Sequence, residues 1–226
     1  MRPLKLVVAA GLAAAALAAS LATAATAAAS GGNDRPLRPL LRDAAGHVDW
    51  GNLTRSERER VLRRWARAPA LLDLILLRLA PRLEMRRTTG AEIAQGNFTE
   101  QFLGGAGTPR DWRVNLSQAV LERGGKLNAH LTLHELGHVV DGVLGSDDWR
   151  ERLFFAFSRS AAWQPCWPMP PGSSSRCVRS NEILADQFAF WATGRREVRS
   201  SYGDPPLLHR AVLGARLAQL LEGASG

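Results

Sequence analysis

The chain has 226 residues, of which 46% are hydrophobic, and a formal net charge of +8 at pH 7. Nearly all of the positive charge is arginine, because lysine occurs only at Lys5 and Lys126. Because the sequence has no nucleic-acid-binding motif and few aromatic residues among its basic ones, the positive net charge does not indicate a nucleic-acid partner. The excess of arginine and alanine instead suggests a GC-rich bacterial genome, and a mild attraction to anionic cell-wall polymers or lipids stays open.

Residues 1–29 have the pattern of a secretory signal peptide. Arg2 and Lys5 precede an alanine-rich apolar stretch, and small residues at 27–29 provide a plausible cleavage site. The stretch is also long enough for an uncleaved anchor, although its many alanines make it weakly hydrophobic and favour cleavage. No second membrane segment follows, so we expect a secreted monomer without stable membrane insertion, whose remaining length fits one domain.

The next segment, residues 30–83, is predicted to be an N-terminal arm followed by helices. Residues 30–50 are polar and irregular, which is typical of an extended arm. Thr54 and Glu57 form a capping box for a helix that runs to about Arg67. Its interspersed charges predict a solvated face for the arginines, which are Arg55, Arg58, Arg60, Arg63 and Arg64.

A second helix is expected from Pro69 through Leu79, and it is apolar nearly all round, so it should be buried. The whole segment 30–83 is also a candidate inhibitory prosegment, which would make the secreted form latent. Residues 84–117 contain several short β-like runs, of which Asp111–Leu116 is the strongest. These patterns predict an α+β fold that is mainly helical with a small sheet.

The run His134-Glu135-Leu136-Gly137-His138 lies among apolar residues. On a helix, positions i and i+4 lie one above the other, so His134 and His138 can bind one metal ion. Glu135 projects beside the pair, where it can take a proton from a water molecule without ligating the metal. The alternative is a polar helix face with solvated histidines, but buried histidines and a buried glutamate are costly without a partner. His130, one turn earlier, is expected to support the site rather than to share the metal.

A second apolar helix is predicted between Ser180, a suitable N-cap, and Gly194, a suitable C-terminal stop. Glu182 and Asp186 lie four residues apart on one face of it. Because a catalytic zinc needs three protein ligands, Glu182 is the candidate third ligand. Asp186 is positioned to accept a hydrogen bond from the far nitrogen of a ligand histidine. The alternative makes Glu182 an acid favoured by the helix dipole and Asp186 a surface residue.

Cys166 and Cys177 bracket a loop rich in Pro, Gly and Ser between the two metal-bearing helices. In an exported protein such a pair predicts a disulfide. It would stabilise the fold by about 2–3 kcal/mol. Residues 204–206 are expected to start a final helix that runs to about Leu221.

The two motifs together resemble the gluzincin group of zinc peptidases, and the second helix is also similar to that of the compact lethal factor-like gluzincins. The resemblance covers residues 113–194 at most. It implies a zincin-like catalytic domain over 84–226, with Glu182 as the third ligand and Asp186 as the partner of a ligand histidine. It also implies an edge strand near the metal helix, where an extended substrate adds as another strand. Trp112–Leu116 is the candidate for that strand.

We therefore expect a zinc metallopeptidase that cleaves protein or peptide substrates with one catalytic Zn²⁺ and Glu135 as general base. Tyr202, the only tyrosine, is the candidate donor to the oxyanion, and its alternative is a half-buried loop aromatic. His209 is the second candidate, for which a surface-helix histidine is the alternative. The competing function is a non-catalytic zinc-binding extracellular protein that interacts with cell-envelope partners.

Overall fold

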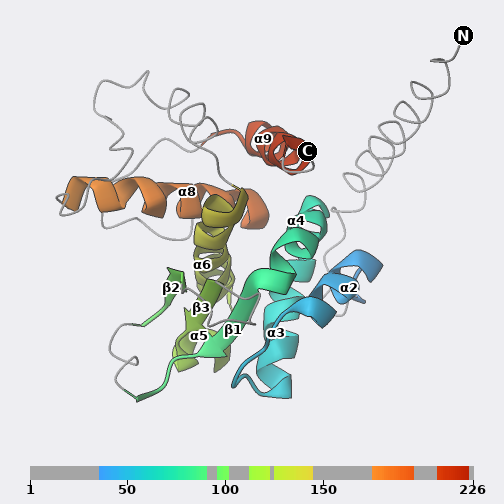
Figure 1. Cartoon of the computed structure of the whole chain (residues 1–226), viewed down its shortest axis with the longest axis vertical. Coiled ribbons are helices and arrows are strands. Elements are labelled where there is room, and N and C mark those ends of the chain that lie inside the picture. Colours follow the sequence, from blue (N-terminus) through green and yellow to red (C-terminus); the bar gives the residue numbers. More distant parts are fainter. Residues whose placement is uncertain are drawn as a thin grey trace, which may run out of the picture.

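The computed structural model describes residues 36–90, 96–101, 112–122, 125–144, 175–195 and 208–223. Among these residues helices predominate and three short strands form one sheet, so the predicted α+β class is confirmed. The elements, shown in Figure 1, are α2 (Pro39–His47), α3 (Arg55–Ala66), α4 (Leu71–Leu79), η2 (Ala80–Arg82), β1 (Leu83–Arg87), β2 (Phe98–Gln101), β3 (Trp112–Leu116), α5 (Gln118–Glu122), α6 (Lys126–Leu144), α8 (Ser175–Thr193) and α9 (Arg210–Gly223). No helix within the described ranges has the length and apolar character that crossing a membrane requires. The predicted signal peptide lies outside these ranges.

The segment expected as an extended arm contains a helix, α2. A proline is tolerated in the first turn, where its missing N–H would have no partner, and Pro39 occupies that position. Leu41 and Ala44 are fully buried in this helix, which packs on α4. Arg38 ties the two helices together, because its guanidinium donates to both carboxylate oxygens of Asp73 at 2.6 and 2.7 Å. The arm prediction is therefore wrong from Pro39 to His47, where tertiary packing stabilises a helix.

Helix α3 begins with the predicted capping box. The Glu57 N–H donates to Thr54 Oγ1, and the Thr54 N–H donates to Glu57 Oε2. The prediction of a solvated arginine face is wrong for Arg64, which is buried. Its guanidinium donates to Thr132 Oγ1 in α6 and to the carbonyl of Val120 in α5. Burial lowers the pKa of Arg64 to about 10, and the nearby cations add to this effect.

Helix α4 is buried on most sides, as its composition predicts, although it begins at Leu71 rather than at Pro69. Four of its side chains are fully buried, namely Leu72, Ile75, Leu76 and Leu79. They belong to one hydrophobic cluster that extends from α2 through the sheet and α6 to α9. The N-terminal helices therefore share a single core with α6, α8 and α9.

The sheet has the strand order β1-β3-β2, with β1 parallel and β2 antiparallel to β3. Val114 of β3 has Met85 on one side and Thr99 on the other. The expectation that Trp112–Leu116 is an edge strand is therefore wrong, because β3 is paired along both sides. The outer edge of β1 is partly covered by a bridge to Asp49, and β2 forms the other edge.

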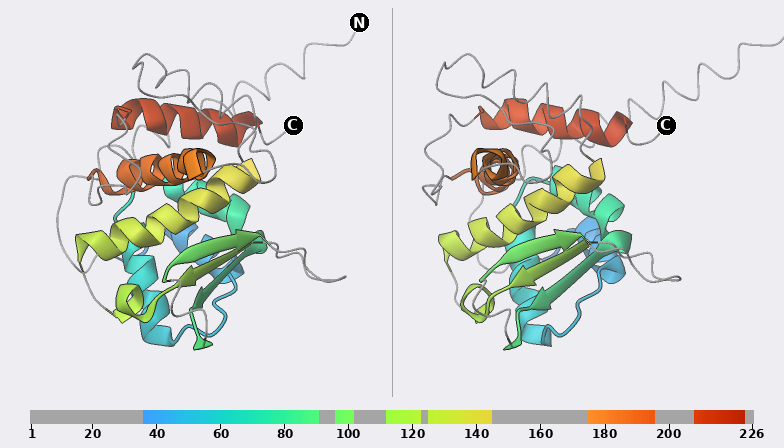
Figure 2. Two further views of the ribbon diagram at one scale, coloured as in Figure 1. Left: turned by 90° about the vertical axis from the view of Figure 1, so that its left-hand side faces the viewer. Right: turned by 60° about the vertical axis from the view of Figure 1, so that its left-hand side comes forward.

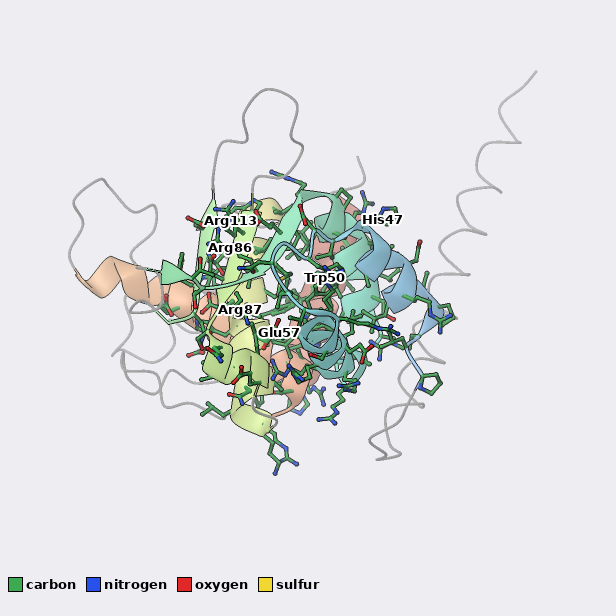
Figure 3. All side chains as sticks on the ribbon, turned by 90° about the horizontal axis from the view of Figure 1, so that it is seen from below. His47, Trp50, Glu57, Arg86, Arg87 and Arg113 are labelled. Atoms are coloured by element: carbon green, nitrogen blue, oxygen red, sulfur yellow. The ribbon has the colours of Figure 1, made fainter. Side chains whose placement is uncertain are left out.

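Helix α6 covers one face of the sheet. In Figure 2, α9, α8, α6 and the sheet are stacked in this order. On the opposite face, Arg113 lies between Glu84 and Glu100, to which it donates at 2.8 and 3.2 Å. Figure 3 shows Arg113 beside Arg86 on this side of the sheet. Arg87, labelled in the same view, pairs with Glu57 at 3.4 Å and thereby links the sheet to α3. These ion pairs fix the sheet on which α6 rests.

Candidate metal centre

Three side chains converge between α6 and α8. His134 and His138 project from successive turns of α6, and Glu182 projects from α8. His134 Nε2 lies 3.1 Å from Glu182 Oε2, and His138 Nε2 lies 3.6 Å from Glu182 Oε1. The three ligand atoms all lie within 4.8 Å of one another. The arrangement can therefore hold a metal ion.

The separations fit the size of a small divalent cation. Zinc binds histidine nitrogen and carboxylate oxygen at about 2.0–2.2 Å, so a tetrahedral site holds its ligand atoms about 3.4 Å apart. The two nitrogen–oxygen distances lie on either side of that value. Two imidazoles and one carboxylate are a donor set that suits zinc among other divalent metals.

A close approach of the two helices allows Glu182 to reach the histidines. A Cβ atom at Gly137 would lie 2.8 Å from Ala185 Cα and 3.1 Å from the Ala185 carbonyl oxygen. Real Cβ atoms do not come so close, so any larger residue at this position of α6 would push α8 away. Ala185 is itself fully buried. The glycine of the HELGH run therefore sets the distance between the elements that carry the ligands.

Asp186 orients the first histidine. Its Oδ1 lies 2.7 Å from His134 Nδ1, which leaves His134 Nε2 directed at Glu182. This is the contact expected from the sequence, in which a carboxylate fixes the tautomer of a ligand. His130 also reaches Asp186, with Nε2 at 3.4 Å, and its ring is only 2% exposed. Asp186 is thus shared by two histidines from consecutive turns of α6.

Glu135 follows His134 on α6, and among the described residues its carboxylate accepts a hydrogen bond from Thr99 and from none of the three candidate ligands. It is buried, and its Oε2 lies 2.9 Å from the hydroxyl of Thr99 in β2. The same hydroxyl lies 2.9 Å from the Glu135 carbonyl oxygen. Burial raises the pKa of Glu135 to about 6. Sequence reasoning did not find Thr99, because only the pairing of β2 with β3 brings it to α6.

The charges of the site favour a cation between the two helices. Burial lowers the pKa of His134, but hydrogen bonds to Asp186 and Glu182 outweigh this effect and raise the pKa to about 10. Burial and the neighbouring His134 lower the pKa of His138 to about 4. Burial would raise the pKa of Asp186, yet hydrogen bonds from His130 and His134 bring it down to about 2. The two carboxylates, Asp186 and Glu182, therefore stabilise positive charge between α6 and α8.

The predicted ends of α8 and the predicted start of α9 agree only in part with the structure. Ser180 is not an N-cap, because α8 begins at Ser175 and includes it. Gly194 does end α8, with a positive φ of 71° that glycine adopts without strain. Helix α9 begins at Arg210, after the exposed His209, and not at residues 204–206. The Nδ1 atom of His209 accepts the N–H of Ala211 at 3.4 Å, a bond at the start of α9.

Two predicted features concern residues outside the described part of the chain. Tyr202 lies there, so its role as an oxyanion donor stays a prediction. Cys166 lies there as well, and its disulfide with Cys177 also stays a prediction.

Comparisons of the chain with protein-family models, curated proteins and solved structures find no match. The resemblance to gluzincins thus depends on the two short motifs, and the functional argument depends on the geometry of α6, α8 and β2.

Proposed function

We propose that this protein is a secreted zinc-dependent endopeptidase. The observation that carries the proposal is the convergence of His134 Nε2, His138 Nε2 and the Glu182 carboxylate, with Glu135 buried next to His134 on α6. A structural zinc site usually closes its fourth position with a protein side chain, whereas a catalytic site has three protein ligands and an open position. Among the described residues, the metal-binding group around Glu182 has three members. This number favours a catalytic zinc.

The proposed chemistry uses the three metal ligands and the general base Glu135. A zinc ion held by His134, His138 and Glu182 would lower the pKa of a water molecule and polarise the carbonyl of a peptide bond. Glu135 takes the proton from the attacking water as a new bond forms between the water oxygen and the carbonyl carbon. When the carbon–nitrogen bond breaks, Glu135 delivers that proton to the leaving amine. Asp186 holds the imidazole of His134 in the tautomer that presents Nε2 to the metal.

Substrate binding is proposed at the outer edge of β2. An extended peptide can add to a sheet edge through main-chain hydrogen bonds. In the described part of the chain, β2 pairs with β3 on one side and no strand pairs with its other side. Thr99 of β2 contacts Glu135 directly, so this edge runs past the proposed general base. We propose Tyr202 as the donor to the oxyanion, and His209 as the second candidate.

The competing proposal is a non-catalytic zinc-binding extracellular protein that interacts with cell-envelope partners. A purely structural site has no use for Glu135, because this residue does not bind the metal. Burial of the Glu135 carboxylate raises its pKa and costs free energy. A catalytic role would explain this cost, so it supports the enzyme proposal over a structural zinc site.

A paired experiment tests the proposal. Zinc content and cleavage of casein are measured on the wild type and on Glu135→Gln, in which the amide oxygen still accepts from Thr99 but the side chain is no base. We expect stoichiometric zinc in both proteins and cleavage only in the wild type. Zinc in both proteins with equal cleavage would remove Glu135 from the mechanism. Absence of zinc from both would refute the metal site itself.

A further inference from the structure

We propose that Thr99 is a positioning residue for Glu135, and that it selects which carboxylate oxygen of Glu135 handles the proton. This inference rests on the proposed function, because it assigns a task to the general base. Thr99 lies on β2, 36 residues before Glu135 in the chain. Nothing in its local sequence marks it as part of the site.

The geometry ties one end of the Glu135 carboxylate to the sheet. Thr99 Oγ1 lies 2.9 Å from Glu135 Oε2 and 2.9 Å from the Glu135 carbonyl oxygen. A hydroxyl has a single hydrogen, so it donates to one of these acceptors at a time. The ionised carboxylate is the stronger acceptor, because hydrogen bonds to charged groups are roughly twice as strong as neutral ones. The hydroxyl hydrogen is therefore directed at Oε2.

The other oxygen, Oε1, has no hydrogen-bond donor among the described residues, which makes it the oxygen available for proton transfer. When Oε1 takes a proton from water, Oε2 becomes a carbonyl-type oxygen and still accepts from Thr99. The Thr99 hydroxyl thus stays satisfied in both states of the base. The carboxylate does not need to rotate between taking the proton and delivering it, so no reorganisation is needed between the two steps.

The position of Thr99 is itself fixed by the sheet. Thr99 lies opposite Val114, which is fully buried on the face covered by α6. Of its two neighbours in β2, Phe98 lies opposite Asn115, and Glu100 lies opposite Arg113 and pairs with it at 3.2 Å. Because side chains alternate along a strand, Thr99 is directed at α6 and Glu100 at the opposite face. A rigid element therefore carries the hydroxyl, which is what a positioning contact needs.

The experiment compares three variants in the full chain. Thr99→Val removes the hydroxyl at nearly constant volume, and Thr99→Ser restores it. Thr88→Val is the matched control, because Thr88 is a buried threonine of the same sheet region whose hydroxyl donates to the Leu116 carbonyl at 3.5 Å. Each protein is tested for zinc content, melting temperature, and kcat and KM on a fluorogenic casein. Zinc-loaded crystal structures of the wild type and of Thr99→Val report the orientation of Glu135 without any assay.

We expect Thr99→Val to bind zinc normally and to lower kcat by about 10- to 100-fold with little change in KM, the size typical of partners that orient a metal site. Thr99→Ser should recover most of the rate, and Thr88→Val should retain it. In the crystal structure of Thr99→Val the Glu135 carboxylate should turn from its wild-type orientation. An unchanged kcat in Thr99→Val, a Thr99→Ser variant as slow as the valine variant, or an unmoved Glu135 would overturn the proposal. If the wild type cleaves no casein, the enzyme proposal fails, and the crystal structures alone still decide whether Thr99 orients Glu135.

Discussion

Gly137 in α6 and Ala185 in α8 are in backbone contact, so closely that a Cβ atom on Gly137 would lie 2.8 Å from Ala185 Cα. Each of the two residues belongs to a metal-binding motif: Gly137 is the residue before His138, and Ala185 is the residue before Asp186. The contact therefore fixes the separation of the imidazoles from the carboxylates. A small increase in that separation would move Glu182 away from both histidine nitrogens, which now lie 3.1 and 3.6 Å from its oxygens.

Gly137→Ala tests this contact. In an unconstrained helix the change would stabilise the fold by up to about 1 kcal/mol. Here the new methyl has no room, so we expect the free energy of unfolding to fall by about 1–3 kcal/mol and the affinity for zinc to fall as well. Urea denaturation and zinc titration measure the two effects. The matched control is Gly46→Ala in α2, where an added Cβ meets nothing within 4 Å. A Gly137→Ala variant as stable as this control would show that the helices can separate without cost.

Asp186→Asn tests the partner of the ligand histidine. The substitution keeps the size of the side chain and removes the charge that accepts from His134 Nδ1 at 2.7 Å. We expect zinc affinity to fall by about 10- to 100-fold. Competition with a chelator measures the affinity. Asp73→Asn is the control, because Asp73 is a buried carboxylate that is also paired, with Arg38, but takes no part in the candidate metal site. That control should lower stability without changing zinc affinity, and equal affinities in the two variants would contradict the role of Asp186.

Features that depend on neighbours in the chain were predictable from the sequence. The capping box of Thr54 and Glu57 is formed by residues three apart. The shared face of His134 and His138, and that of Glu182 and Asp186, follow from one helical turn. The strand Trp112–Leu116 was also found, because its alternation and its β-branched residue are local signals.

Features that depend on tertiary pairing were not predictable. The central position of β3 follows from its pairing with both β1 and β2, and the residues of β3 alone do not predict this strand order. The sequence pattern predicts Arg64 to be a surface cation, whereas in the fold its guanidinium is buried and donates to acceptors in α5 and α6. Thr99 reaches Glu135 for the same reason, through strand pairing over 36 residues. Propensity and periodicity carry no information on such contacts.

Zinc binding should release about one proton at pH 7. In the metal-free protein His134 has a pKa of about 10 and is protonated at pH 7, whereas His138 has a pKa of about 4 and is neutral. A ligand nitrogen must be deprotonated, so zinc displaces the proton of His134. The affinity for zinc should therefore rise about tenfold per pH unit above pH 7 and level off as pH approaches the His134 pKa. Calorimetric titration in buffers of different ionisation enthalpy measures the proton count. No proton release at pH 7 would mean that Asp186 and Glu182 do not hold a proton on His134.

The last prediction concerns the N-terminal helices, which sequence analysis left open as an inhibitory prosegment. Removal of residues 30–82 would delete the fully buried side chains of Trp65, Leu72 and Ile75, among others, from the core that also contains Leu133 and Leu136 of α6. Loss of a large buried side chain typically costs about 2–5 kcal/mol, so several losses together exceed the stability of an ordinary domain. A chain that begins at Leu83 should therefore be insoluble or unfolded, which circular dichroism and zinc content will show. Mature protein from culture supernatant should begin near Ser30 in N-terminal sequencing. An active, zinc-loaded product that begins near Leu83 would instead establish the prosegment and show that α6 and α8 fold without α2, α3 and α4.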